Sequence, residues 1–217
     1  MLGVIVPAHN EEALLAPCLA ALITASRHED LAAEPVRIMV VLDACDDFSG
    51  AIARAYGVET LSLDARNVGI ARATGADWLL AHGARWLAFT DADSRVSARW
   101  LTSQLALNAD AVCGSIAVDD WSEHPESVRE HFQKTYTDAD GHRHIHGANL
   151  GVSAHAYLRA GGFPPLTCSE DVALVDRLIA IGAHIAWSAA PRVITSARTA
   201  ARARGGFGDT LVAMAAV

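Results

Sequence analysis

The 217-residue sequence predicts an α/β fold with a mostly parallel sheet flanked by helices. In the first half, short apolar runs alternate with longer amphipathic segments, which is the pattern of repeated βαβ units. Hydrophobic residues make up 52% of the chain and charged residues 19%, a balance that excludes a disordered protein. Because no internal repeat or long linker interrupts the pattern, we expect a single domain, residues 1–217, with a first half of 1–95 and a second half of 96–217.

The expected elements of the first half follow one another in regular order. Residues 2–6 are a strand, and residues 11–25 are a helix whose apolar residues keep helical spacing. Residues 36–42 are rich in branched apolar side chains, as expected of a strand that is covered on both faces. The half continues with a helix at 48–56, a strand at 58–63, a helix at 69–82 and a strand at 86–90.

The second half departs from this rhythm. We expect a helix at 97–108 with Ser97 as its N-terminal cap, and then a strand at 111–118. The following segment, 119–146, is polar and rich in histidine. Glycines mark the ends of two later helices. The remaining expected elements are helices at 125–136, 152–160 and 171–181 and strands at 183–187 and 193–196.

Charge and motif content exclude several classes of function. The net charge is −8, so we expect no nucleic-acid partner. Lys134 is the only lysine, and no phosphate-binding GxxxxGKS/T loop surrounds it. The four cysteines form no CxxC pair, which excludes a zinc ribbon and a thioredoxin-like motif.

The sequence also bears on location. It contains no signal peptide and no apolar run of roughly 18 residues, so we expect a cytoplasmic protein without a transmembrane segment. Peripheral contact with the inner face of a membrane stays open. The apolar end at 211–217 is too short to span a bilayer, but it could contact a membrane or bury itself in a homodimer.

Unusual polar residues follow the first four expected strands. In an open parallel sheet, ligands bind beyond the carboxyl ends of the strands, so we expect these residues to share one edge. In strand order they are His9, Asn10, Glu11 and Glu12; Asp43, Asp46 and Asp47; Arg66, Asn67, Gly69 and Arg72; and Asp91 and Asp93.

The pair Asp91 and Asp93 is the sharpest local feature. Residues two apart in an extended segment project to the same side, so both carboxylates can face one point. Such a pair suits Mg²⁺ or Mn²⁺, which shares its coordination with substrate phosphates. The alternative is a solvated turn that follows a strand.

Two further stretches have both a functional and an ordinary interpretation. In the stretch 66–72, Gly69 would let the backbone approach a ligand closely, and Arg72 would donate hydrogen bonds to phosphate. The alternative is an ordinary loop with a surface arginine. Asp171 could accept a proton from an incoming hydroxyl, or it could merely complement the dipole of the helix that follows it.

Three histidines, His142, His144 and His146, alternate along the chain and would share one face of an extended segment. A zinc site is therefore conceivable, although the sequence shows no polar partners that would orient the histidine rings. The alternative is a set of surface or hydrogen-bonded histidines.

Together, these residues resemble the inverting family 2 glycosyltransferases of the GT-A fold, from Val4 to about Arg198. The segment 4–12 (VIVPAHNEE) is similar to the family's first strand and nucleotide loop, and 41–47 (VLDACDD) stands where the family has an aspartate-rich segment. Residues 67–75 resemble the family's NxGxxxARNxG-like helix start, with two residues fewer between the glycine and the arginine. The sequence also has the DxD motif, the HGAN and GGF stretches at 146–149 and 161–163, and an ED…R element at 170–177.

The resemblance implies transfer of a sugar from a nucleotide diphosphate donor to an acceptor hydroxyl by metal-assisted single displacement. Residues 1–95 would bind the nucleotide, with UDP the commonest carrier and GDP or dTDP open, and residues 96–217 would bind the acceptor. Asp171 would be the catalytic base, and Asp91 and Asp93 would hold Mg²⁺ or Mn²⁺. The implied donor residues are Pro7, His9, Glu11, Asp43, Asn67, Gly69, Arg72, Asp91 and Arg198, and the implied acceptor residues are His146, Gly147, Asn149 and Glu170.

Three other functions compete with this interpretation. A sugar-nucleotide nucleotidyltransferase needs an early glycine-rich basic loop, whereas residues 7–11 are PAHNE. A dinucleotide oxidoreductase would need a GxGxxG motif that is absent. A nucleotide- or carbohydrate-binding module without turnover stays possible, and it would be favoured if Asp171 lay far from the pair Asp91 and Asp93.

Overall fold

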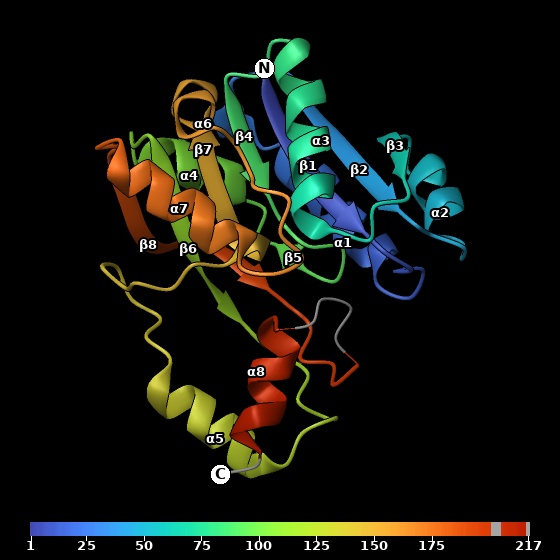
Figure 1. Cartoon of the computed structure of the whole chain (residues 1–217), viewed down its shortest axis with the longest axis vertical. Coiled ribbons are helices and arrows are strands. Elements are labelled where there is room, and N and C mark those ends of the chain that lie inside the picture. Colours follow the sequence, from blue (N-terminus) through green and yellow to red (C-terminus); the bar gives the residue numbers. More distant parts are fainter. Residues whose placement is uncertain (201–204, 216–217) are drawn as a thin grey trace.

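The computed structural model describes residues 1–200 and 205–215. In these residues an eight-stranded mixed sheet lies between helices, with the strand order β3-β2-β1-β4-β7-β6-β8-β5 (Figure 1). The strands are β1 (Leu2–Ala8), β2 (Val36–Asp43), β3 (Glu59–Leu63), β4 (Trp86–Phe89), β5 (Arg95–Val96), β6 (Ala111–Ala117), β7 (Leu150–Ser153) and β8 (Ile185–Ile194).

The first four strands confirm the expected βαβ arrangement, because β1 pairs in parallel with both β2 and β4, and β2 pairs in parallel with β3. In the second half, β7 runs antiparallel between β4 and β6, while β8 is parallel to β6. The helices are α1 (Leu15–Ser26), α2 (Ser49–Ala55), α3 (Val68–Ala81), α4 (Trp100–Ala106), α5 (Glu126–Thr135), α6 (Ala154–Ala160), α7 (Glu170–Ala180) and α8 (Phe207–Met214), with short 3-10 turns at Glu29–Leu31 and Gly147–Asn149.

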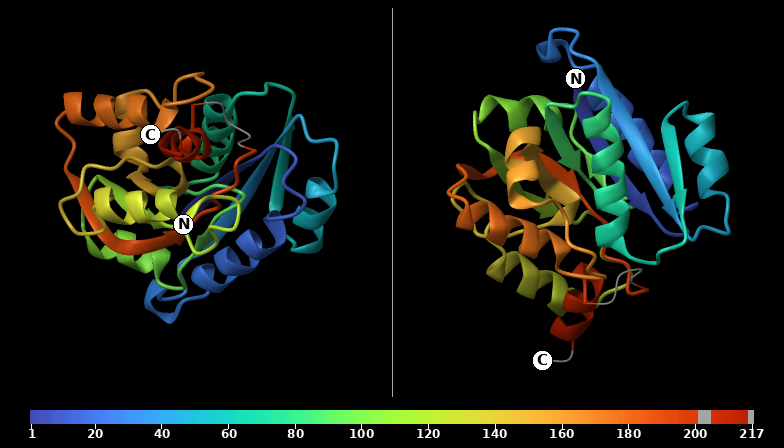
Figure 2. Two further views of the ribbon diagram at one scale, coloured as in Figure 1. Left: turned by 90° about the horizontal axis from the view of Figure 1, so that it is seen from below. Right: turned by 45° about the horizontal axis from the view of Figure 1, so that its top comes forward.

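Alternating side chains of the strands face two separate apolar layers. In β1, Val4 and Val6 pack on the side of α1 and α4, whereas Ile5 packs on the side of α3, α6 and α7. This is the two-residue period of a strand that is buried on both faces. Figure 2 shows the helices on the two sides of the sheet. The inner strands β1, β4, β7 and β6 are therefore covered on both faces.

Several expected elements differ from the structure. Residues 152–160 are the end of β7 followed by α6, because the Ser153 side chain accepts a hydrogen bond from the Ala156 amide and caps the helix there. The two late strands are one strand, β8, whose pairing with β6 is irregular between Gly114 and Ile116. Helices α1 and α4 begin later than expected, and Ser97 does not cap α4. Strand β5 and helix α8 were not expected.

Helices α5 and α8 pack against each other at one end of the molecule (Figure 1). The buried residues of this small apolar cluster are Val128 and Phe132 of α5, Leu211 of α8, and Ala197 from the segment after β8. The apolar end of the chain thus begins inside the protein, while its last two residues, 216 and 217, lie outside the described part. Within the described ranges, the structure contains no helix with the length and apolar character that crossing a bilayer requires.

Candidate active site

The loops after β1 and β2 are bound to each other at the carboxyl edge of the sheet. The Nδ1 atom of His9 lies 2.7 Å from the Asp43 carbonyl oxygen. Asn10 and Asp46 exchange two hydrogen bonds, of 2.7 and 2.9 Å. Pro7, next to this loop, is still part of β1 and pairs with Val41. The residues expected at this edge therefore form a connected rim.

Asp43, one of the donor residues that the resemblance implies, is 4% exposed. It accepts hydrogen bonds from the backbone amides of Ala65 and Arg66 at one oxygen and of Asn67 at the other, at 2.7–2.8 Å. Asn67 in turn caps α3, because its side chain accepts a hydrogen bond from the Ile70 amide. Asp43 thus shapes the loop that leads into α3.

Gly69 allows a close backbone approach, but the segment that approaches it belongs to the protein itself. A Cβ atom at this position would overlap the carbonyl oxygen of Pro164. The Gly69 amide donates to the carbonyl oxygen of Leu166 at 3.1 Å. The sequence motif predicted a ligand here, and it could not reveal this contact because about a hundred residues separate the partners.

Arg72 is buried between two carboxylates. The residue is 3% exposed, its Nη2 atom lies 2.5 Å from Oδ1 of Asp91, and its Nη1 atom is paired with Oε1 of Glu170. Its guanidinium also lies over the Phe163 ring, 5.7 Å from the ring centroid. Arg72 therefore joins the end of β4 to the start of α7.

Asp171 lies beside this cluster. Its Oδ2 atom accepts a hydrogen bond of 2.7 Å from the Gly147 amide, and its Oδ1 atom accepts one from its neighbour Val172. A Cβ atom at Gly147 would overlap the guanidinium of Arg72. The space between Asp171 and Arg72 therefore admits only glycine. Asp171 and Asp91 therefore belong to one neighbourhood, linked through Gly147 and Arg72. This is the arrangement that a catalytic interpretation requires.

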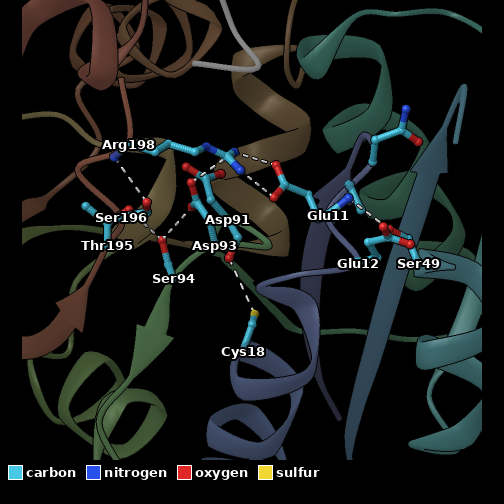
Figure 3. A network of polar contacts seen from close by, with 12 residues as sticks. Glu11, Glu12, Cys18, Ser49, Asp91, Asp93, Ser94, Thr195, Ser196 and Arg198 are labelled. Atoms are coloured by element: carbon cyan, nitrogen blue, oxygen red, sulfur yellow. Dashed lines mark hydrogen bonds and ion pairs between the residues drawn. The ribbon is translucent and has the colours of Figure 1, made fainter. Parts of the chain in front are cut away.

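A second cluster surrounds Asp93 (Figure 3). Arg198 donates two hydrogen bonds to Glu11, of 2.7 and 2.5 Å, and its Nη2 atom lies 3.1 Å from Oδ2 of Asp93. Burial, and next the neighbouring Asp91 carboxylate, raise the pKa of Asp93 to about 7. The carboxylates at this edge therefore repel one another, and Arg198 offsets part of the repulsion.

The donor set fits Mg²⁺ or Mn²⁺ shared with a phosphate-bearing ligand. Such ions are commonly held by one or two carboxylates, with phosphate oxygens and water completing the shell. Asp91 and Asp93 supply two, and the raised pKa of Asp93 reflects a charge that a cation would stabilise. Over residues 1–200 and 205–215, the structure shows no cluster of three or more His, Cys, Asp or Glu placed to hold a metal.

The three alternating histidines are stacked with an aromatic residue. The rings of His142 and His144 are 5.4 Å apart, those of His144 and His146 are 5.9 Å apart, and Tyr136 stacks on His144 at 4.1 Å. The Tyr136 hydroxyl lies 3.0 Å from Nε2 of His146 and accepts a hydrogen bond from the Ile116 amide. Within the described residues this stack is not a zinc site.

His146 predicts a pH dependence of stability. Burial, and next the nearby His144 and His142, lower its pKa from 6.5 to about 4. Because the unfolded chain takes up this proton first, stability is lost as the pH falls from about 6.5 to 4. Relative to His146→Gln, the wild type should lose on the order of 2 kcal/mol over this range, measured by urea unfolding. The difference in unfolding free energy between the two proteins should be constant above pH 7. If the two proteins show parallel curves of unfolding free energy against pH over the whole range, the prediction is wrong.

Other expected site residues are less accessible. Asn149 is fully buried: it accepts from the Trp100 indole at 2.9 Å and donates to the carbonyl oxygens of Ser115 and Pro191. Glu170 is 3% exposed and paired with Arg72. Sequence reasoning missed one contact of interest here. Ser94 donates to Thr195 at 2.8 Å and ties the segment before Arg198 to the aspartate pair. No local signal marks this contact, because 101 residues separate the partners.

Solved glycosyltransferase structures share this fold. TarS from S. aureus, in complex with UDP-GlcNAc, has a TM-score of 0.73 and 14% identity, covering 95% of this chain and 61% of that one. The mannosyltransferase PcManGT from Pyrobaculum calidifontis, in complex with GDP-Man and Mn²⁺, has a TM-score of 0.66 and 18% identity, covering 94% and 58%. Glucosyl-3-phosphoglycerate synthase from Mycobacterium tuberculosis, in complex with phosphoglyceric acid, has a TM-score of 0.64 and 17% identity, covering 100% and 80%.

This chain spans about three fifths of the length of the TarS and PcManGT chains. No protein with curated annotation matches the sequence significantly. Residues 3–160, more than half of the chain, match the family described as glycosyl transferase family 2. The chain therefore belongs to glycosyltransferase family 2 and has the GT-A fold.

Proposed function

We propose that this protein is an inverting glycosyltransferase that moves a sugar from a nucleotide diphosphate donor to an acceptor hydroxyl. One observation carries the proposal. Asp171 lies against Gly147, and Gly147 lies against the arginine that binds Asp91, so the candidate base is linked to the aspartate pair through these two residues. Family membership favours glycosyl transfer over nucleotidyl transfer.

On the donor side, Asp91 and Asp93 would hold Mg²⁺ or Mn²⁺, which when bound would neutralise the charge that develops on the departing diphosphate. The chain itself contributes positive charge at this edge through Arg198. Its guanidinium is held by Glu11 and is 20% exposed as a side chain, so it can still meet a phosphate. Arg72 is buried and keeps Asp91 in position.

On the acceptor side, Asp171 takes the proton of the acceptor hydroxyl while that oxygen attacks the anomeric carbon. A bond forms between the acceptor oxygen and the anomeric carbon, and the bond from that carbon to the diphosphate oxygen breaks. Attack from the face opposite the leaving group inverts the configuration. The amides of Gly147 and Val172 fix the orientation of the Asp171 carboxylate. A positioned base of this kind typically contributes 10²–10⁴-fold to the rate.

UDP is the first candidate carrier and GDP the second, since the solved neighbours were crystallised with UDP-GlcNAc and with GDP-Man and Mn²⁺. The donor-side residues proposed are Pro7, His9, Glu11, Asp43, Asn67, Asp91 and Arg198. Gly69 and Arg72 are not among them, because they contact other parts of the protein. On the acceptor side the candidates are the partly exposed His146 and, through its backbone, the buried Gly147. The expected cytoplasmic location and homodimer stay predictions, which cell fractionation and the measured mass in solution would test.

A thermal-shift screen tests the donor side. The protein is mixed with UDP, GDP or dTDP, each with and without Mn²⁺. We expect one nucleotide to stabilise the fold, and to do so more strongly with Mn²⁺. A ligand at about 100 times its Kd stabilises the folded state by about 2.7 kcal/mol, which is measurable as a rise in Tm. Indifference to every nucleotide in the presence of Mn²⁺ would contradict the proposal. An assay of sugar transfer from the matching nucleotide-sugar then distinguishes an enzyme from a binding module.

A further inference from the structure

The cluster around Asp93 holds its own positive charge. Arg198 reaches this position from the segment after β8, while Glu11 follows β1 and Asp93 follows β4, so three distant parts of the chain meet there (Figure 3). Glu11 and Asp93 are largely buried, with side chains 6% and 15% exposed. A buried carboxylate requires a positive partner, and Arg198 is that partner for both.

The two contacts of Arg198 are unequal. Toward Glu11 the guanidinium donates two hydrogen bonds, of 2.5 and 2.7 Å. Toward Asp93 it makes a single contact of 3.1 Å. Two-point contacts between arginine and a carboxylate are the stronger and more specific kind. Glu11 therefore holds Arg198 in place, and the contact with Asp93 is the one that another cation can replace.

We propose that Arg198 is a resident counter-cation of Asp93 and competes directly with the divalent metal for that carboxylate. The inference rests on the proposed function, since it concerns the metal site assigned there. When a metal binds Asp93, the guanidinium gives up this contact but stays at the edge of the site, because Glu11 still binds it at two points. Arg198 thus lowers the affinity of the protein alone for the metal.

The surroundings of Arg198 suit such an exchange. A cavity of about 210 Å³ reaches both Asp93 and Arg198, so a hydrated cation has a path to the contact. The same cavity is lined by Asp119, Asp120 and Glu123, which attract cations to its mouth, and by Arg95. Arg72, by contrast, is 3% exposed and is bound on the other side by Glu170, so it offers no comparable path.

The test is a titration of the protein alone with Mn²⁺, followed by isothermal calorimetry or by electron paramagnetic resonance of free Mn²⁺. We expect Arg198→Gln to bind Mn²⁺ at least tenfold more tightly than the wild type. Arg95→Gln is the matched control. It removes an arginine from the wall of the same cavity, but this arginine is paired with Asp119 and not with Asp93. We expect its Mn²⁺ affinity to stay within twofold of the wild type.

A second pair of variants keeps the test decisive. Arg198→Lys retains the charge but loses the two-point contact with Glu11, so its affinity should fall between the wild type and Arg198→Gln. If Arg198→Gln does not fold, as judged by circular dichroism, Arg198→Lys alone decides the question. In the background of Asp93→Asn, the gain from Arg198→Gln should shrink, because the contested carboxylate has lost its charge.

Several outcomes would overturn the inference: an unchanged or weaker Mn²⁺ affinity in Arg198→Gln, equal gains in Arg198→Gln and Arg95→Gln, or a gain that is undiminished by Asp93→Asn. An Arg198→Lys variant that binds no more tightly than the wild type would also overturn it. Because the titration contains no nucleotide or sugar, none of these results tests the proposed sugar transfer, which is measured in a separate assay. Conversely, absent transfer with tighter Mn²⁺ binding in Arg198→Gln would reject the function and retain the competition.

Discussion

Replacing Asp171 by Asn is expected to lower kcat by about 10³-fold while the affinity for the nucleotide changes by less than twofold. The asparagine side chain has the same shape, and its single acceptor oxygen can keep the hydrogen bond from the Gly147 amide while the exposed one from Val172 is lost, so the site should keep its form. What is lost is the ability to take a proton from the acceptor, and removing a positioned base costs about 10²–10⁴-fold in rate. Initial rates of transfer and calorimetric titration with the nucleotide measure the two quantities separately.

Asp176→Asn is the matched control for this variant. Asp176 lies on the same helix, α7, five residues after Asp171. Its side chain is exposed. Its transfer rate should equal that of the wild type. An Asp171→Asn enzyme with an undiminished rate would show that another group takes the proton, and the acceptor side of the proposal would then be wrong.

Replacing Arg72 by Met is expected to lower the free energy of unfolding by about 3–5 kcal/mol. The substitution leaves Glu170, which is 3% exposed, without its cationic partner, and a buried carboxylate without a partner is among the most destabilising features a fold can carry. Methionine retains most of the apolar volume of the arginine side chain. The loss of stability therefore reflects the missing charge more than altered packing. Urea unfolding of the two proteins at pH 7 gives the difference.

Two further proteins locate the origin of this loss. Arg85→Met breaks an exposed pair with Glu34, in which the arginine side chain is 56% exposed, and should cost less than about 1 kcal/mol. The double variant Arg72→Met with Glu170→Gln should recover part of the stability, because it removes the uncompensated charge. If Arg72→Met is as stable as Arg85→Met, the buried cluster does not stabilise the fold as described.

The parts of the fold that the sequence predicted are those specified by local pattern. Strands β1 to β4 and the helices between them follow from runs of apolar residues and their spacing, and the structure confirms them within a few residues. Strand β7 did not follow, because its four residues, Leu150–Ser153, are too few to show a period and lead directly into α6. Its place between β4 and β6 comes from long-range pairing that no local signal encodes.

The same limit applies to the candidate site. The residue types at the strand ends indicated which groups gather, but not which would bind one another. Arg72 was expected to meet phosphate, and the structure instead places it between Asp91 and Glu170. The partners Arg198 and Glu11 are 187 residues apart, so their contact depends on the whole fold. Local sequence therefore predicts the composition of such a site better than its internal contacts.

The reversed direction of β7 has a consequence for how this architecture can diversify. Because Phe89 pairs with Leu150 in antiparallel register, the chain enters β7 at the same edge where it leaves β4. The turn at Gly147–Asn149 is thus delivered beside Asp91 by a segment separate from the loops that follow β1, β2 and β3. Under the proposed function, changes in length or composition upstream of this turn would alter which acceptor the site admits, while the frame formed by β1 to β4 stays as it is.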